Sequence, residues 1–344
     1  MGLSQMEKFA TAPFFIPTHH CFLEDKMKIV LTDIITITNG EDDLSLKPLH
    51  SLGSITSYPL TDYEEIPERI SDAEAVICNK TKLDSHSLAN AKNLKYIGLW
   101  ATGYDNIDIP YCKSNGITVC NAGSYSTYAV AQHTFSLILE HYGKTGAYNG
   151  FVQSGGWRKS TTFSPIAYRT HELFGKTIGI VGYGTIGKAV AKIASAFGMK
   201  VLGYNRSGKV DDFAEYAPLD ELYANSDIIS VHCPLTDENR HMFNEEAFAK
   251  FKKGALFVNT ARGGLVDESA LKQAVEIGHL GGAAIDVIYP EPMSEDCMLT
   301  GVDNILITPH IAWAPIETRE RLLGIVCENL KAFQNGTPQN VVSK

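Results

Sequence analysis

Three residues that lie far apart in the sequence have the side chains needed to reduce a 2-keto acid. Arg262 can bind a carboxylate through paired hydrogen bonds and polarise the adjacent keto group. His310 can deliver a proton to the new alkoxide, and Glu291 can orient that histidine and favour its protonated form. Each also has a simpler interpretation: Arg262 as a structural ion-pair partner, His310 as a turn residue, and Glu291 as a loop charge between two prolines.

The segments that precede these residues predict how they meet. Short apolar runs alternate with amphipathic stretches, which is typical of an α/β protein. In the second half of the chain, strands are predicted over 177–181, 200–204, 228–232, 255–259, 282–286 and 305–308. Arg262 follows the fourth, Glu291 the fifth and His310 the sixth. Ligands bind beyond the carboxyl ends of such strands, so we expect the three side chains at one rim of the sheet.

The first of these strands runs into a glycine-rich loop. Gly182, Gly184 and Gly187 form the pattern G-x-G-x-x-G, which allows a tight turn, close approach of a pyrophosphate and packing of the next helix. The amides of Thr185 and Ile186 at the helix start would face the phosphates. Glycines can also serve a simple turn, but the flanking strand and helix favour a dinucleotide site.

The residues after the second strand predict which dinucleotide binds. An acid at this point usually holds the ribose hydroxyls of NAD, and here the sequence is Asn205-Arg206-Ser207. Arg206 could pair with a 2′-phosphate while Ser207 donates a hydrogen bond, which favours NADP slightly over NAD. In the alternative, Asn205 holds the ribose of NAD and Arg206 is a solvated surface charge.

Further polar residues follow the remaining strands. The predicted cofactor site is completed by His232, Cys233, Pro234, Thr260, Ala261 and Asp286. His232 either lines the adenine side or is a core histidine with satisfied hydrogen bonds. Asp286 either caps a helix or faces the nicotinamide, and its place at a strand end favours the second. No His, Cys and carboxylate cluster has metal-ligand spacing, so no metal is predicted.

Length and composition restrict the class of protein. The 344 residues suit two domains, and the net charge of −9 argues against a nucleic-acid partner. No segment has the roughly 20 consecutive apolar residues of a membrane helix. The seven cysteines are scattered without a C-x-x-C pair, which indicates reduced thiols in a cytoplasmic protein. Residues 1–26 lack the features of a secretion signal, and we treat them as an extension of unknown role.

The ends of the chain predict a second set of elements. Strands are expected over 28–32, 75–79, 96–100 and 117–120, with helical stretches over 67–71 and 85–91. A long helix is expected to begin at 126 or 127, and a last one to cover 316–336.

Several of these motifs resemble the D-isomer-specific 2-hydroxyacid dehydrogenase family, over about residues 27–342. Besides the glycine loop, the matching segments are ATGYDNID at 101–108, HCPLT at 232–236, NTARG at 259–263, Asp286 through Glu291-Pro292, and PHIAW at 309–313. The sequence at 101–104 and 310–315 is most similar to the glycerate dehydrogenase, or hydroxypyruvate reductase, branch. That branch acts on hydroxypyruvate/D-glycerate or glyoxylate/glycolate.

The resemblance implies two Rossmann-like domains with doubly wound parallel sheets. The substrate domain would be discontinuous, built from 27–125 and 309–344, with the dinucleotide-binding domain at 126–308. Arg262, Glu291 and His310 would be catalytic, and Trp313 would lie at the substrate. Backbone amides of Thr102 and Gly103 would help to bind the substrate carboxylate, and the protein would be a homodimer.

A protein of another class remains as an alternative. Some interaction proteins sense dinucleotides on this same fold and keep the Arg, Glu and His residues. The chain stops soon after its last predicted helix and has no disordered tail for a partner, which favours the enzyme.

Overall fold

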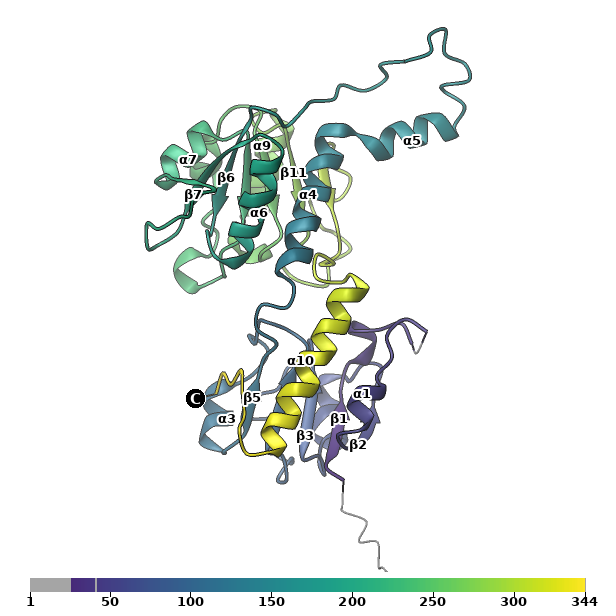
Figure 1. Ribbon diagram of the computed structural model, residues 1–344, viewed down its shortest axis with the longest axis vertical. Helices are drawn as coiled ribbons and strands as arrows, with labels where there is room; N and C mark the ends of the chain where they lie inside the picture. Colours follow the sequence, from purple (N-terminus) through teal and green to yellow (C-terminus); the bar gives the residue numbers. More distant parts are fainter. Residues whose placement is uncertain (1–25, 41, 344) are drawn as a thin grey trace, which may run out of the picture.

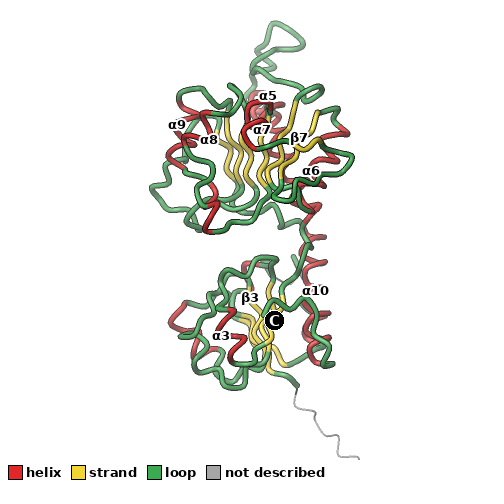
Figure 2. Tube along the Cα trace, turned by 90° about the vertical axis from the view of Figure 1, so that its left-hand side faces the viewer, coloured by secondary structure: helices red, strands yellow, loops and turns green. Residues whose placement is uncertain are grey.

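Two parallel β-sheets organise the chain, each inside its own lobe (Figures 1 and 2). The computed structural model describes residues 26–40 and 42–343. The predicted extension over 1–26 therefore lies almost entirely outside the described residues. None of the helices in the described ranges is both long and apolar enough to cross a membrane.

The first sheet has five parallel strands in the order β2-β1-β3-β4-β5. They are β1 (Lys28–Leu31), β2 (Ser54–Ser57), β3 (Ala75–Cys78), β4 (Tyr96–Leu99) and β5 (Thr118–Cys120). The short helices of this lobe are α1 (Lys47–His50), α2 (Ile66–Arg69) and α3 (Ile109–Ser114). Because the strand order reverses between β1 and β3, the loops after these two strands border a crevice at the carboxyl edge.

The last helix returns to this first sheet. Helix α10 (Ile316–Gln334) buries Leu322, Val326 and Leu330 in one core with Leu31 and Trp100. In Figure 1 the helix, in yellow, lies alongside the purple and blue strands from the start of the chain. Burial of this apolar face is what holds the two ends of the sequence in one lobe.

The second sheet has seven parallel strands in the order β12-β11-β10-β9-β6-β7-β8. They are β6 (Thr177–Val181), β7 (Lys200–Tyr204), β8 (Glu215–Tyr216), β9 (Ile228–Val231), β10 (Leu256–Asn259), β11 (Gly282–Ile285) and β12 (Ile305–Ile307). Its helices are α4 (Thr127–Gly143), α6 (Thr185–Ala196), α7 (Leu219–Asn225), α8 (Glu245–Ala249) and α9 (Glu268–Glu276). Here the order reverses between β6 and β9, beside the glycine loop.

An arm projects from the second lobe. It begins with α5 (Thr145–Gln153), which follows α4 after a left-handed turn at Lys144, and continues as a long excursion before β6 (Figure 1). The side chains of Phe163 and Ile166 on this excursion are 91% and 90% exposed. Such exposure of large apolar side chains is typical of a surface that contacts another molecule.

The α/β prediction with two parallel sheets is confirmed, and most predicted strands end within one residue of the observed ones. The helix predicted over 85–91 is wrong. The segment forms turns, because the Asp84 carboxylate accepts hydrogen bonds from the amides of His86 and Ser87 and closes a single turn. The division into 27–125 with 309–344 and 126–308 stays a prediction.

Candidate active site

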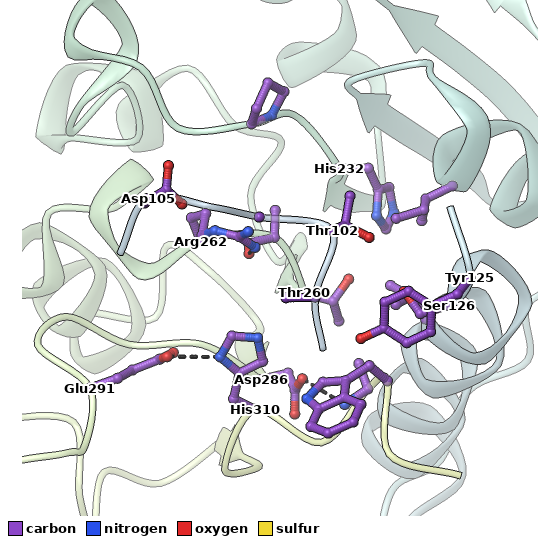
Figure 3. A pocket seen from close by; sticks show the side chains of 18 of the residues that line it. Thr102, Asp105, Tyr125, Ser126, His232, Thr260, Arg262, Asp286, Glu291 and His310 are labelled. Atoms are coloured by element: carbon purple, nitrogen blue, oxygen red, sulfur yellow. Dashed lines mark hydrogen bonds and ion pairs between the residues drawn. The ribbon is translucent and has the colours of Figure 1, made fainter. Parts of the chain in front are cut away.

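Both sheets direct the loops at their carboxyl ends toward one cavity of about 460 Å³ (Figure 3). The predicted residues that line it are Thr102, Gly103, Ile186, His232, Cys233, Pro234, Thr260, Ala261, Arg262, Asp286, Glu291, His310 and Trp313. The others lie outside its lining: Gly182, Gly184, Thr185 and Gly187 follow β6, and Asn205, Arg206 and Ser207 follow β7. Residues from distant parts of the chain thus converge as the strand-end argument expects.

His310 and Glu291 form a hydrogen-bonded pair in this cavity. The Nδ1 atom of His310 lies 2.7 Å from Oε2 of Glu291 (Figure 3). Burial by itself would raise the pKa of Glu291, but the hydrogen bond and charge of His310 outweigh it and leave that pKa below its usual value. Glu291 is therefore ionised at neutral pH. The pairing uses Nδ1 and leaves Nε2 of His310 for another partner.

A buried carboxylate fixes the segment that carries His310. Asp286 is 1% exposed and accepts hydrogen bonds from the Thr308 hydroxyl at 2.6 Å and from the amides of Ile311 and Ala312, each at 2.9 Å. Between these contacts His310 adopts a φ of 55°, a conformation that non-glycine residues rarely adopt without support. Since these partners belong to a turn, the helix-cap interpretation of Asp286 is wrong.

Asp286 has a further neighbour, His133 on α4. Its Nε2 atom lies 2.9 Å from the Thr308 hydroxyl and 3.4 Å from the carboxylate of Asp286. Burial would raise the pKa of Asp286, but the hydrogen bonds from His133, Thr308 and the two backbone amides keep it below its usual value. No sequence pattern marks His133, and the crossing of α4 over the second sheet is what creates this contact.

The guanidinium of Arg262 packs against the loop after β4 that carries Gly103. Its Nη1 donates to the carbonyl of Ala261 at 2.7 Å, and a Cβ added to Gly103 would lie 2.8 Å from its Nη2. The next residue, Gly263, packs so closely on the carbonyl group of Ile288 that no side chain fits between them. The loop of Arg262 is therefore in direct contact with the segment that leads to Glu291.

The glycine loop has the geometry of a phosphate site. Gly182 has a φ of 100° and packs on the backbone of His232 and Cys233, where a Cβ would clash. A Cβ at Gly187 would meet the carbonyl of Gly182, whereas one at Gly184 would meet nothing within 4 Å. Gly184 thus leaves open space at the start of α6, as close approach of a pyrophosphate would require.

His232 lies between this loop and the cavity. Its Nε2 is 2.8 Å from the Ser230 hydroxyl, while its buried Nδ1 has no hydrogen-bond partner among the described residues. Burial lowers the pKa of His232 to about 3, so the ring is neutral. An unpartnered buried nitrogen at a cavity wall fits a polar ligand atom better than it fits a fully satisfied core histidine.

The turn after β7 is organised by Asn205. Its Nδ2 donates to the carbonyl of Lys209 at 2.6 Å, and its Oδ1 accepts from the Ser207 hydroxyl and the Lys209 amide. The side chain of Asn205 is thus used within the turn. The side chains of Arg206 and Ser207 are exposed beyond it.

Several cavity residues had no predicted role. Those with polar side chains are Asn79, Lys80, Asp105, Asn106, Tyr125 and Ser126. Asn79 and Lys80 follow β3 directly, so the strand-end rule that found Arg262 would have found them too. Tyr125 and Ser126 lie where the chain passes from the first sheet to α4. The sequence predicts the start of that helix, but no local pattern places it at the cavity.

Comparison with known proteins identifies the family. Residues 135–312 match the model of the D-isomer specific 2-hydroxyacid dehydrogenase NAD binding domain. Hydroxypyruvate reductase of Blautia hydrogenotrophica is 40% identical over 92% of this chain and all of its own length. Glycerate dehydrogenase of Methylorubrum extorquens is 39% identical over 81% of this chain and 88% of its own.

Solved structures agree with the sequence comparison. The TT0316 protein from Thermus thermophilus superposes with a TM-score of 0.83 at 34% identity, over 92% of this chain and all of that one. The chain belongs to the D-isomer-specific 2-hydroxyacid dehydrogenase family, and it is an NAD(P)-dependent oxidoreductase of that family.

The contact between Gly103 and Arg262 generates a prediction. In Gly103→Ala the new methyl group displaces the guanidinium, and misplacement by a fraction of an ångström weakens substrate binding. We expect KM for the keto acid to rise about 10-fold or more, while the dissociation constant of NADPH stays constant. Steady-state kinetics and fluorescence titration measure the two. The control is Gly324→Ala on α10, where an added Cβ meets nothing; equal KM values for the two variants would contradict the prediction.

Proposed function

We propose that this chain reduces hydroxypyruvate to D-glycerate, or glyoxylate to glycolate, with NADPH preferred slightly over NADH. The observation that carries the proposal is the His310–Glu291 pair in the same cavity as Arg262. Relatives named hydroxypyruvate reductase and glycerate dehydrogenase support the choice of substrate. As in the family, Arg262, Glu291 and His310 are the proposed catalytic set.

Arg262 and the loop after β4 bind the substrate carboxylate in this proposal. The guanidinium lies against Gly103, and the amides of Thr102 and Gly103 donate no hydrogen bond to any described residue. Unpaired amides beside a guanidinium suit an anion with two oxygens. The Thr102 hydroxyl donates to the carbonyl of Gly123 and the side chain of Asn121 to the carbonyl of Thr102, which hold this loop in place. Trp313 lines the same cavity.

His310 acts as the acid in reduction and as the base in oxidation. Its Nδ1 is bound to Glu291, so Nε2 gives the proton to the substrate oxygen as that oxygen gains charge. The Glu291 carboxylate stabilises the imidazolium and fixes the plane of the ring. A bound NAD(P)H supplies the hydride. The residues at the glycine loop, together with His232, Cys233, Pro234, Thr260, Ala261 and Asp286, are the proposed contacts of that cofactor.

The turn after β7 supports NADP over NAD. The polar groups of Asn205 are satisfied within the turn, so they are not free for ribose hydroxyls. The exposed guanidinium of Arg206 makes no ion pair with any described residue and can pair with a 2′-phosphate. Ser207 lies beside it with its hydroxyl on Asn205.

The projecting arm supports a homodimer. Its exposed apolar side chains Trp157, Phe163 and Ile166 would be covered by a second copy of the chain. Cys78 and Cys112 are buried and carry free thiols, which supports a cytoplasmic location.

Removal of the imidazole tests the proposed acid. His310→Ala should lower turnover of hydroxypyruvate about 100-fold or more, the usual scale for loss of a general acid. Activity is followed as NADPH oxidation, with glyoxylate, pyruvate and 2-ketoisocaproate as further substrates. His50→Ala, at an exposed position on α1, is the matched control. Unchanged turnover in His310→Ala would remove this residue from the mechanism.

Cofactor preference can be measured without turnover. Arg206→Ala should raise the dissociation constant of NADPH about 10-fold and that of NADH less than about 3-fold, because only NADPH carries the 2′-phosphate. Dissociation constants come from fluorescence titration. Lys253→Ala removes an equal charge from the same lobe at another exposed position and should alter neither constant. Equal losses for the two cofactors would end the argument for NADP.

The homodimer can be tested by mass. Light scattering should give twice the chain mass of 37.7 kDa. Charges introduced by Phe163→Asp with Ile166→Asp should shift the protein toward the monomer, because unpaired charges are costly in an apolar interface. Leu60→Asp, which alters an exposed apolar residue of the other lobe, is the control. A wild-type monomer at micromolar concentration would refute the homodimer.

A further inference from the structure

We propose that Lys80 is a specificity-determining residue, whose ammonium group donates a hydrogen bond to the 3-hydroxyl of the substrate and selects 2-keto acids that carry one. The inference rests on the proposed function and deepens it, because it distinguishes hydroxypyruvate from acids of the same size without that hydroxyl.

Lys80 lies where a parallel sheet places its ligands. It follows β3, whose neighbour β1 ends shortly before Asp33, and the strand order reverses between these two strands. Crevices at such reversals are the usual binding sites of open α/β sheets. In the second sheet the corresponding crevice holds the glycine loop. The first sheet therefore brings Lys80 to the cavity from the other lobe.

Two side chains hold the loop of Lys80 rigidly. The buried carboxylate of Asp33 accepts hydrogen bonds from the amides of Asn79, Lys80 and Thr81 at 3.0, 2.6 and 2.9 Å. The side-chain amide of Asn106 donates to the carbonyl of Thr81 at 2.7 Å and ties the loop to the segment of Gly103. A backbone fixed in this way positions a side chain for recognition.

The ammonium group itself has no protein partner. In the described part of the chain, Nζ of Lys80 makes neither a hydrogen bond nor an ion pair, although the residue lines the cavity. The side chain is open to solvent, yet the surrounding walls bury it enough to lower its pKa, against the opposing charge of Glu291. Lys82, two residues on, is paired with Asp84 on the surface instead.

The geometry of the substrate leaves one group for Lys80. The carbonyl carbon of a 2-keto acid is trigonal, with its three substituents in one plane. If Arg262 binds the carboxylate and His310 faces the keto oxygen, the C3 group points to the remaining wall. Lys80 and Arg262 are the two Lys or Arg residues of the described cavity lining, and Arg262 is already assigned to the carboxylate.

The charges around Lys80 favour a hydroxyl over a second anion. Arg262 also acts electrostatically on Lys80, but the substrate carboxylate would neutralise that positive charge. Glu291 and Asp105 line the same cavity, and both act electrostatically on Lys80. Their negative charges would oppose another carboxylate or a phosphate. A neutral hydroxyl can accept from the ammonium without that repulsion. A site built to bind a hydroxyl discriminates against the analogue that lacks it.

The test compares hydroxypyruvate with pyruvate, which has a methyl group at C3, and with oxaloacetate, which has a second carboxylate. In Lys80→Met the ratio of kcat/KM for hydroxypyruvate to that for pyruvate should fall about 10- to 100-fold, the scale of one hydrogen bond to a charged donor. Lys80→Arg should recover part of the ratio. Lys82→Met removes the neighbouring charge and should leave the ratio as in the wild type. An unchanged NADPH dissociation constant shows that Lys80→Met is folded.

The outcomes separate this inference from the proposed function. Wild-type reduction of hydroxypyruvate together with an unchanged ratio in Lys80→Met would overturn the role of Lys80 and leave the proposed function intact. Equal losses on hydroxypyruvate and pyruvate, or oxaloacetate as the substrate most dependent on Lys80, would overturn it as well. A wild-type chain that reduces none of these acids would overturn both proposals.

Discussion

The site depends on the hydrogen bonds that the buried carboxylate of Asp286 accepts. This carboxylate satisfies two amides of the turn after β12 and the hydroxyl of Thr308, and this allows His310 to adopt a left-handed conformation. A carboxylate so deeply buried would be costly without such partners, so turn and anion stabilise each other. The same turn presents Nδ1 of His310 to Glu291, which leaves Nε2 available to the proposed substrate.

The fold completes the site because the carboxyl ends of the strands of both sheets face the same cavity. One sheet contributes Arg262, Glu291 and His310 after three successive strands, and the other contributes the loops of Lys80 and Gly103. Close backbone packing at Gly263 joins the loop of Arg262 to the segment before Glu291. Helix α10 holds the two ends of the chain in the first lobe, so both loops reach the cavity from a single body.

Local sequence patterns predict much of this arrangement. The glycine spacing and the strand-end positions suffice for the glycine loop and for Arg262, Glu291 and His310. Local patterns do not predict the elements and side-chain positions that tertiary contacts determine. Edge strand β2 has one apolar residue and β8 has two residues, so neither shows an apolar run. His133 reaches Asp286 only because α4 crosses the second sheet, and no spacing in the sequence records that crossing.

The most direct test is a crystal structure of the protein with NADPH and oxamate, a keto-acid isostere that cannot be reduced. We expect the oxamate carboxylate on the guanidinium of Arg262 and its carbonyl oxygen about 3 Å from Nε2 of His310, with Glu291 still bound to Nδ1. An imidazole turned away from the carbonyl oxygen, or a carboxylate bound far from Arg262, would contradict the account.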